Sequence, residues 1–146
     1  MEKAGLYIHI PFCKSKCPYC DFYSGKYSRE AAEKYTSELI DEFCKYGGAE
    51  FDTVYFGGGT PSILEPRLIA KILQAARKSF KIADNSEITI ECNPSKDLKE
   101  DIEIYAASGI NRISLGMQSA VKAERQALGR IAGKEEIVRT LDYARQ

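Results

Sequence analysis

Four short apolar runs alternate along the chain with longer segments whose apolar residues recur at helical spacing. The runs cover residues 6–10, 53–56, 87–91 and 112–115 and are rich in β-branched and aromatic residues. Alternating apolar and polar side chains, as in 6–10, and β-branched composition both favour strands. Each run is therefore predicted to be a β-strand, and Pro11 is predicted to end the first.

The segments that follow these runs are predicted helices. Ser28 and Ser95 are expected N-caps, because a serine hydroxyl can accept a hydrogen bond from the first helical turn, and Pro66 suits the start of the second helix. Gly129 and Gly133 are expected to break the last helical region. The residues predicted to face the core are Ala32, Tyr35, Leu39, Phe43, Tyr46, Leu68, Ile69, Ile72, Ala76, Phe80, Leu98, Ile102, Tyr105, Ala106, Ile137, Val138 and Leu141.

Strand–helix alternation repeated four times predicts an α/β fold with a parallel sheet and right-handed crossovers. The 146 residues are 44% hydrophobic and 29% charged, as in one globular unit without an interdomain linker. Lys and Arg number 21, as do Asp and Glu, so no net field would attract nucleic acid or an anionic membrane. With no secretion signal, no run of about 18–20 apolar residues and reduced cysteines, we expect a cytoplasmic protein.

The segment after each predicted strand is unusual in composition. Three cysteines fall in 13–20, three glycines open 57–61, a Glu-Cys-Asn-Pro sequence fills 91–94, and 116–118 read Gly-Met-Gln. The carboxyl ends of parallel strands lie at one edge of a sheet, where ligands of α/β proteins bind. The four segments are therefore expected to form one site.

Cys13, Cys17 and Cys20 place three thiols within eight residues. Clustered thiolates suit iron–sulfur clusters, zinc or copper. Three ligands leave one iron of a four-iron cluster open for a substrate or cofactor, whereas structural zinc needs four ligands and no nearby side chain completes that set. Cys92 is expected to pack in the core, because Glu91 and Cys92 point to opposite faces of a strand. The spacing favours an open iron–sulfur cluster, with zinc as the alternative.

The other candidates at these strand ends each have a plainer interpretation. Residues 57–59 can be a tight turn or a bare backbone surface for a ligand's amino or carboxylate group. Glu91 and Gln118 suit hydrogen bonds to a ribose or an ammonium group, and are otherwise solvated loop residues. Arg130 suits a carboxylate, and is otherwise a surface charge. His9 lies in mid-strand, where a hydrogen-bonded core histidine is expected rather than a direct chemical role.

Motifs along the whole chain resemble those of a known family. The spacing Cys13-x₃-Cys17-x₂-Cys20, with Tyr19 as its aromatic residue, resembles the signature of the radical S-adenosylmethionine superfamily. More narrowly, the chain is similar to the oxygen-independent coproporphyrinogen III oxidase family. The motifs that carry this likeness are YIHIPFC at 7–13, YFGGGTP at 55–61, ECNP at 91–94 and RISLGMQS at 112–119.

The resemblance implies a partial (β/α) barrel of the radical S-adenosylmethionine type, with four βα units, in which the three cysteines hold a 4Fe–4S cluster. It implies that S-adenosylmethionine binds the open iron and is reductively cleaved to methionine and a 5′-deoxyadenosyl radical. No catalytic residue beyond the cofactor ligands is expected. The residues expected to bind the cofactor are Tyr7, Tyr19, Gly58, Gly59, Thr60, Glu91, Gln118 and Arg130.

Phe22 separates two branches of this family. Members that decarboxylate coproporphyrinogen III have a further cysteine two residues after the third, where this chain has Phe22. The segment CDFYS at 20–24 resembles the heme chaperone branch instead, which is thought to bind and deliver heme. We therefore expect a heme chaperone, with an oxidase that makes protoporphyrinogen IX as the alternative. A zinc-binding structural module or an inactive fragment is the second alternative.

The same resemblance implies ligands and partners beyond this chain. Heme or coproporphyrinogen III is expected to bind the full-length protein, and an electron donor such as flavodoxin or ferredoxin is expected to reduce it. Nucleic acid is not expected, and membrane contact is expected only if heme is delivered there. A full barrel needs about 200–250 residues. Residues 1–146 are therefore expected to be the N-terminal part of a core domain, without its C-terminal units, and to turn over poorly.

Overall fold

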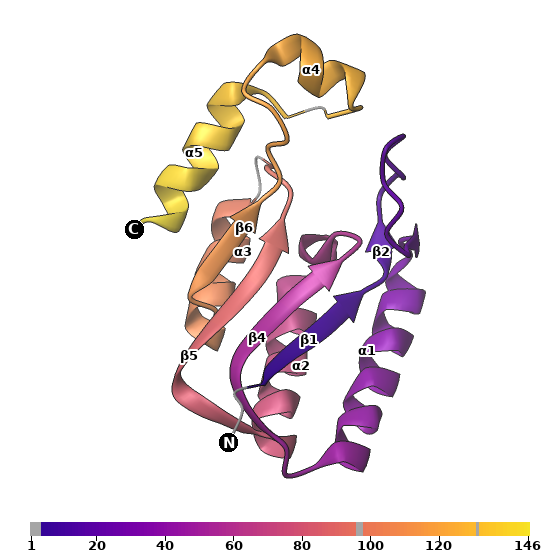
Figure 1. Cartoon of the computed structure of the whole chain (residues 1–146), viewed down its shortest axis with the longest axis vertical. Coiled ribbons are helices and arrows are strands. Elements are labelled where there is room, and N and C mark those ends of the chain that lie inside the picture. Colours follow the sequence, from indigo (N-terminus) through magenta and orange to yellow (C-terminus); the bar gives the residue numbers. More distant parts are fainter. Residues whose placement is uncertain (1–3, 96–97, 131) are drawn as a thin grey trace.

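The computed structural model describes residues 4–95, 98–130 and 132–146. Its centre is a four-stranded sheet in the order β1 (Gly5–Ile10), β4 (Glu50–Gly58), β5 (Lys81–Cys92) and β6 (Arg112–Leu115). Every neighbouring pair is parallel. The principal helices are α1 (Arg29–Phe43), α2 (Pro66–Ser79), α3 (Leu98–Ser108) and α5 (Lys134–Ala144) (Figure 1). The predicted parallel α/β fold is confirmed.

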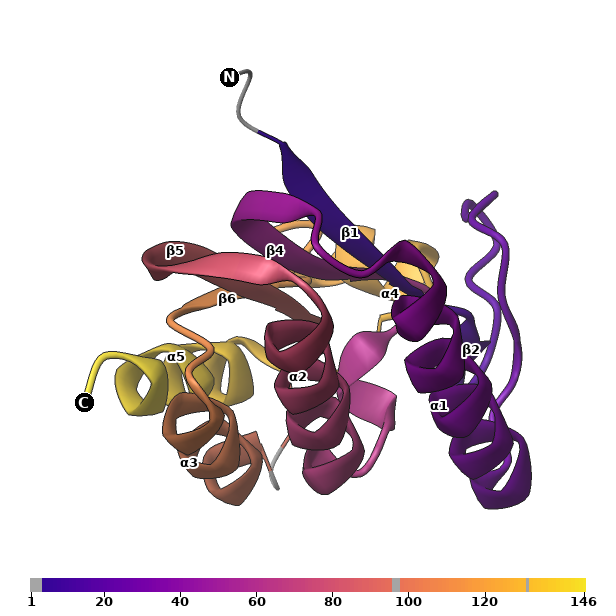
Figure 2. The ribbon, with the colours of Figure 1, turned by 90° about the horizontal axis from the view of Figure 1, so that it is seen from below.

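The sheet follows the order of the chain, and α1, α2, α3 and α5 lie on the same side of it (Figure 2). A doubly wound sheet reverses its strand order and has helices on both faces, whereas a (β/α) barrel places each unit beside the last. The architecture is therefore a segment of a barrel. The face opposite the helices, here called the open face, includes Tyr7, which is 54% exposed.

The core lies between the sheet and its helices. Side chains alternate between the two faces of a strand, so every second residue of β1, β4 and β5 points to the helices. These residues are at most 1% exposed: Ile8, Ile10, Val54, Phe56, Ile88 and Ile90. They pack with the apolar side of α2, whose buried residues are Ile69, Ile72, Leu73 and Ala76.

Most local signals act as predicted. The Ser28 hydroxyl accepts a hydrogen bond from the Ala31 amide at 3.1 Å and caps α1, and Pro66 occupies the first turn of α2. Ser95 was expected to cap α3, which starts at Leu98. Residues 96–97, between the two, lie outside the described ranges. In those ranges, no helix combines the length and apolar character needed to cross a bilayer.

Four residues that were predicted to face the core are exposed instead. Tyr46 lies in the short 3-10 turn η1 (Cys44–Tyr46), where the register of α1 has already ended. Ala106 of α3 is exposed although it lines the gap between α3 and α5. Val138 and Leu141 are 45% and 40% exposed. They belong to α5, which lies beside the last strand of the sheet and has fewer elements to pack against.

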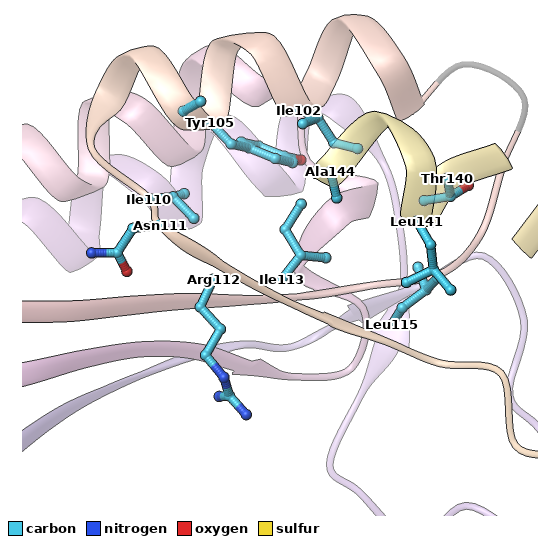
Figure 3. A pocket seen from close by; sticks show the side chains of 11 residues that line it. Ile102, Tyr105, Ile110, Asn111, Arg112, Ile113, Leu115, Thr140, Leu141 and Ala144 are labelled. Carbon is cyan, nitrogen blue, oxygen red and sulfur yellow. The ribbon is translucent and has the colours of Figure 1, made fainter. Parts of the chain in front are cut away.

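A cavity of about 320 Å³ lies between α3, β6 and α5 (Figure 3). Its walls are mainly apolar and include Tyr105 and Ile113. None of its lining residues belongs to the site predicted from the sequence, and it lies between the last strand and two of the helices that cover it. The cavity is therefore a packing gap near the last strand, separate from the predicted chemistry.

Candidate cofactor site

The segments that follow the four strands touch one another at the carboxyl edge of the sheet. The Gly59 amide, after β4, donates to the carbonyl oxygen of Ile10 at 2.9 Å, at the end of β1. The Gly116 amide, after β6, donates to the carbonyl oxygen of Cys92 at 2.9 Å, at the end of β5. The structure thus brings together the four segments that the sequence marked.

The cysteine loop, residues 11–27, projects beyond this edge (Figure 1). Its two ends are joined by a short parallel pair, β2 (Phe12–Cys13) and β3 (Gly25–Lys26). The Phe12 side chain is buried and makes an edge-to-face contact with the Tyr35 ring of α1, with centroids 5.6 Å apart. The base of the loop is therefore fixed to the core, and its cysteines lie above it.

Cys13, Cys17 and Cys20 are free thiols with intermediate exposure. Among the described residues, no three His, Cys, Asp or Glu side chains converge as ligands of one metal ion. The anchored loop thus carries three accessible thiols, and thiolates are ligands of both iron–sulfur clusters and zinc.

The glycine turn, residues 57–60, packs directly on Cys13. A Cβ built on Gly59 would lie 2.6 Å from the carbonyl oxygen of Phe12 and 3.0 Å from Cys13 Sγ. Gly58 has a φ of 116°, which side chains disfavour. Thr60 Oγ1 lies 3.6 Å from Cys13 Sγ, a hydrogen-bonding distance for sulfur. The turn needs bare backbone to lie this close to the thiol, which favours its functional interpretation over that of an ordinary turn.

Glu91 is held on the open face by Tyr55, whose ring stacks on that of Tyr7. The Tyr55 hydroxyl donates to Glu91 Oε1 at 2.7 Å, and the Tyr55 and Tyr7 rings stack with centroids 6.0 Å apart. Burial and the hydrogen bond to Glu91 raise the pKa of Tyr55, while burial and the Glu91 charge raise the pKa of Tyr7. Both phenols are therefore neutral donors near pH 7, and the Glu91 carboxylate points away from the helices.

The other two cysteines lie outside this group. Cys92 is 3% exposed on the helix side of β5, as its position after Glu91 predicted. Burial raises the pKa of the Cys92 thiol to about 12, so it is protonated near pH 7 and unsuited to metal ligation. Cys44 is exposed in η1, which follows the C-terminal end of α1, whereas the cysteine loop precedes the N-terminal end of that helix.

His9 is hydrogen-bonded, as predicted, but it is not a core histidine. Strand alternation buries Ile8 and turns His9 to the open face, where its Nε2 lies 3.0 Å from the carbonyl oxygen of Tyr23. A carbonyl only accepts, so Nε2 is the donor there, while Nδ1 lies 3.3 Å from the Tyr7 hydroxyl oxygen. A Cβ on Gly58 would lie 2.8 Å from the His9 ring. His9 therefore fills the space between the glycine turn and the end of the cysteine loop.

Arg130 reaches the cysteine loop from the segment after α4 (Lys122–Ala127). Its Nε donates to the Tyr19 hydroxyl at 3.0 Å, and its guanidinium carbon lies 5.9 Å from the centre of the Tyr19 ring. One terminal nitrogen donates to Asn93 Oδ1 at 2.8 Å. The structure thus joins two residues that are 111 positions apart and that the sequence assigned to one site.

Gln118 and Asn93 differ from expectation in opposite ways. Gln118 is exposed, has a φ of 68°, and lies next to the Gly116 backbone, so its predicted cofactor contact stays a prediction. Asn93 was not among the predicted site residues, yet its amide contacts both Arg130 and Thr60. The sequence did contain a signal for Asn93. This residue lies two positions after Glu91, and in an extended chain the side chains of such residues point to the same side.

Comparison with known proteins gives a consistent result along the chain. The profile of the Radical SAM superfamily matches residues 7–146. The heme chaperone HemW of Escherichia coli is 38% identical over 144 residues, which are 95% of this chain and 38% of that protein. The radical S-adenosyl methionine domain-containing protein 1, mitochondrial, of Mus musculus is 36% identical over 149 residues, covering 98% of this chain and 33% of its own length.

A solved structure has the same fold. Coproporphyrinogen III oxidase (HemN) from Escherichia coli, described as a radical SAM enzyme, superposes with a TM-score of 0.88 at 29% sequence identity. The match covers 99% of this chain and 35% of that one. The chain therefore spans about a third of the length of the relatives that it matches.

Proposed function

Because the chain belongs to the radical SAM superfamily, we propose that Cys13, Cys17 and Cys20 bind a 4Fe–4S cluster whose open iron accepts S-adenosylmethionine. The observation that carries this proposal is the contact between the cysteine loop, the glycine turn and Arg130 at one edge of the sheet. A bound cluster supplies the electron that cleaves the cofactor's sulfonium. The protein's own contribution is to hold that cofactor at the cysteine loop.

The contacts of Arg130 and Glu91 support a role for each in holding the cofactor. The Arg130 guanidinium suits the carboxylate of S-adenosylmethionine, and the Glu91 carboxylate, held by Tyr55, suits its ribose or amino group. The other residues proposed to contact the cofactor, the glycine turn through its backbone, are Tyr7, Tyr19, Gly58, Gly59, Thr60 and Gln118.

Anaerobic reconstitution of cysteine variants tests the cluster. Wild-type protein is expected to bind about four irons and to absorb broadly near 400 nm. Replacing Cys13, Cys17 and Cys20 together by alanine abolishes that colour, while Cys44→Ala, a change at an exposed cysteine outside the loop, retains it. A colourless wild-type protein with one bound zinc would refute the cluster and support the structural zinc module.

The heme chaperone branch is the finer proposal for the whole protein. Phe22, 63% exposed on the cysteine loop, stands where decarboxylating members of the resembled family have a cysteine. On this proposal residues 1–146 are the N-terminal part of a longer cytoplasmic core domain that binds heme and takes electrons from a flavodoxin or ferredoxin. Decarboxylation of coproporphyrinogen III is the alternative activity, and an inactive fragment is the alternative to both.

Two assays on the reconstituted protein separate these functions. Titration with heme is expected to shift the heme absorbance, and incubation with coproporphyrinogen III, reductant and S-adenosylmethionine is expected to give no protoporphyrinogen IX. Robust production of protoporphyrinogen IX would establish the oxidase instead. Failure of both assays, in protein that assembles its cluster, would indicate a fragment that binds the cofactor alone.

A further inference from the structure

Asn93 lies where several segments of the site meet. Its backbone amide donates to Ser62 Oγ at 3.2 Å, in the short 3-10 turn η2 (Pro61–Ile63). Its side-chain Nδ2 donates to Thr60 Oγ1 at 3.2 Å, and its Oδ1 accepts from Arg130 at 2.8 Å. A Cβ on Gly116 would lie 2.9 Å from Oδ1, so that glycine leaves room for the amide. One residue thus contacts the segments after β4, β6 and α4.

Both side chains that bond to the Asn93 amide also contact residues of the cysteine loop. Thr60 Oγ1 lies 3.6 Å from Cys13 Sγ, which belongs to the proposed cluster ligands. Arg130 Nε donates to the Tyr19 hydroxyl at 3.0 Å, between the second and third cysteines of the loop. A continuous set of polar contacts therefore runs from Cys13 through Asn93 to Tyr19.

We propose that Asn93 is a positioning residue that fixes the Arg130 guanidinium and the Thr60 hydroxyl for S-adenosylmethionine binding beside the cluster. The inference rests on the proposed function. An amide suits this role because one end accepts from a cation while the other donates to a hydroxyl. An arginine side chain loses much rotamer freedom when it binds a ligand. Asn93 holds it in place beforehand, so the cofactor meets a guanidinium that is already oriented.

The test compares anaerobically reconstituted wild-type protein with Asn93→Ala, Asn93→Asp and Asn111→Ala. Asn111 is a matched control, because its amide also bonds at both ends, to the Ile88 amide at 2.8 Å and the Ser86 carbonyl oxygen at 2.9 Å. It lies at the opposite edge of the sheet, before β6. The readouts are iron per chain, melting temperature, and the S-adenosylmethionine concentration that half-saturates the change in the EPR spectrum of the reduced cluster.

Asn93→Ala is expected to keep its iron and to raise the half-saturating concentration about tenfold or more, as for loss of a hydrogen bond to a charged group. Asn93→Asp keeps the acceptor for Arg130 and loses the donor to Thr60, so a smaller rise of about threefold is expected. Asn111→Ala lowers the melting temperature and leaves the half-saturating concentration unchanged.

The proposal is overturned if Asn93→Ala keeps its iron and its half-saturating concentration is unchanged. It is also overturned if Asn111→Ala raises the half-saturating concentration as much as Asn93→Ala does. If Asn93→Ala fails to fold, Asn93→Asp decides: an unchanged half-saturating concentration overturns the proposal and a raised one supports it. A wild-type protein that forms no cluster, or whose spectrum ignores S-adenosylmethionine, refutes the proposed function itself. The two failures are therefore distinguishable.

Discussion

At the scale of single residues, Gly59 sets how closely the glycine turn approaches the cysteine loop. The nearest atoms to a Cβ at this position would be a backbone oxygen of Phe12 and the Cys13 sulfur, at 2.6 and 3.0 Å. The backbone oxygen cannot move without shifting the base of the loop, which the buried Phe12 side chain anchors. A methyl group at position 59 therefore has to separate the turn from the loop.

We expect Gly59→Ala to lower the free energy of unfolding by about 1–3 kcal/mol, a typical cost of overpacking, and to reduce the iron bound on reconstitution. Gly133→Ala is the matched control, because a Cβ at Gly133 would meet no atom within 4 Å and its φ of −78° suits any residue. Chemical denaturation and iron analysis measure both effects. Equal iron content and stability in the two variants would contradict the close contact.

Cys92 differs from the other cysteines in its ionisation. Burial raises the pKa of its thiol from 9.0 to about 12, so the folded protein favours the neutral form. Iodoacetamide near pH 8 is expected to label the metal-free protein at Cys13, Cys17, Cys20 and Cys44, and Cys92 only after unfolding, as followed by mass spectrometry. Labelling of Cys92 as fast as Cys44 would contradict its burial.

The same shift predicts a pH dependence of stability. Because the folded pKa lies above the unfolded value, the contribution of the neutral Cys92 thiol is complete below about pH 9 and is lost as pH rises toward 12. Denaturation midpoints of the wild type and Cys92→Ala measured across that range should converge as pH rises. A constant difference between them would mean that the Cys92 thiol does not titrate differently in the two states.

Strand alternation predicted the opposite directions of Glu91 and Cys92, which the structure confirms. Family resemblance assigned Arg130 and Tyr19 to one site, and their side chains are in contact, whereas the ligand role of Cys13, Cys17 and Cys20 stays a prediction. Asn93 was missed because an asparagine before a proline is common in loops, and only its partners show its role. His9 was assigned to the core, although the alternation that buries Ile8 places His9 on the open face. Contacts between distant segments are fixed by tertiary packing, which local patterns do not encode.

At the scale of elements, type and order were predictable, whereas the strand starts were not. The strands β4 and β5 begin at Glu50 and Lys81, several residues before the predicted 53 and 87. The added residues are mostly polar and break the apolar pattern. They extend because Glu50 pairs with Lys81 and Phe51 with Ile82 in the parallel ladder. Strand length there depends on the neighbouring strand rather than on local propensity.

The helices differ in how far they support the fold. Ile72 of α2 is fully buried under the centre of the sheet, whereas Val138 of α5 is 45% exposed beside its last strand. Ile72→Ala is expected to lower the free energy of unfolding by about 2–5 kcal/mol, and Val138→Ala by about 0.5 kcal/mol. Urea denaturation followed by circular dichroism measures both. Similar losses in the two variants would mean that α5 packs in the core as tightly as α2.

At the scale of the whole molecule, the helices cover one face of the sheet and the chemistry lies at one edge (Figure 2). The open face bears tyrosines, a histidine and a carboxylate, which parallel sheets rarely leave to solvent. The relatives are about three times as long as this chain, so most of their length lies beyond the aligned part. On the proposed function, this chain by itself holds a cluster with one iron free of protein ligands.

Mössbauer spectroscopy of the anaerobically reconstituted protein distinguishes such an iron from the other three. If Cys13, Cys17 and Cys20 each bind a different iron, one iron site is expected to differ from the others and to change its parameters when S-adenosylmethionine is added. Equivalent irons that ignore S-adenosylmethionine, or no bound iron in the wild-type protein, would contradict the proposed cluster.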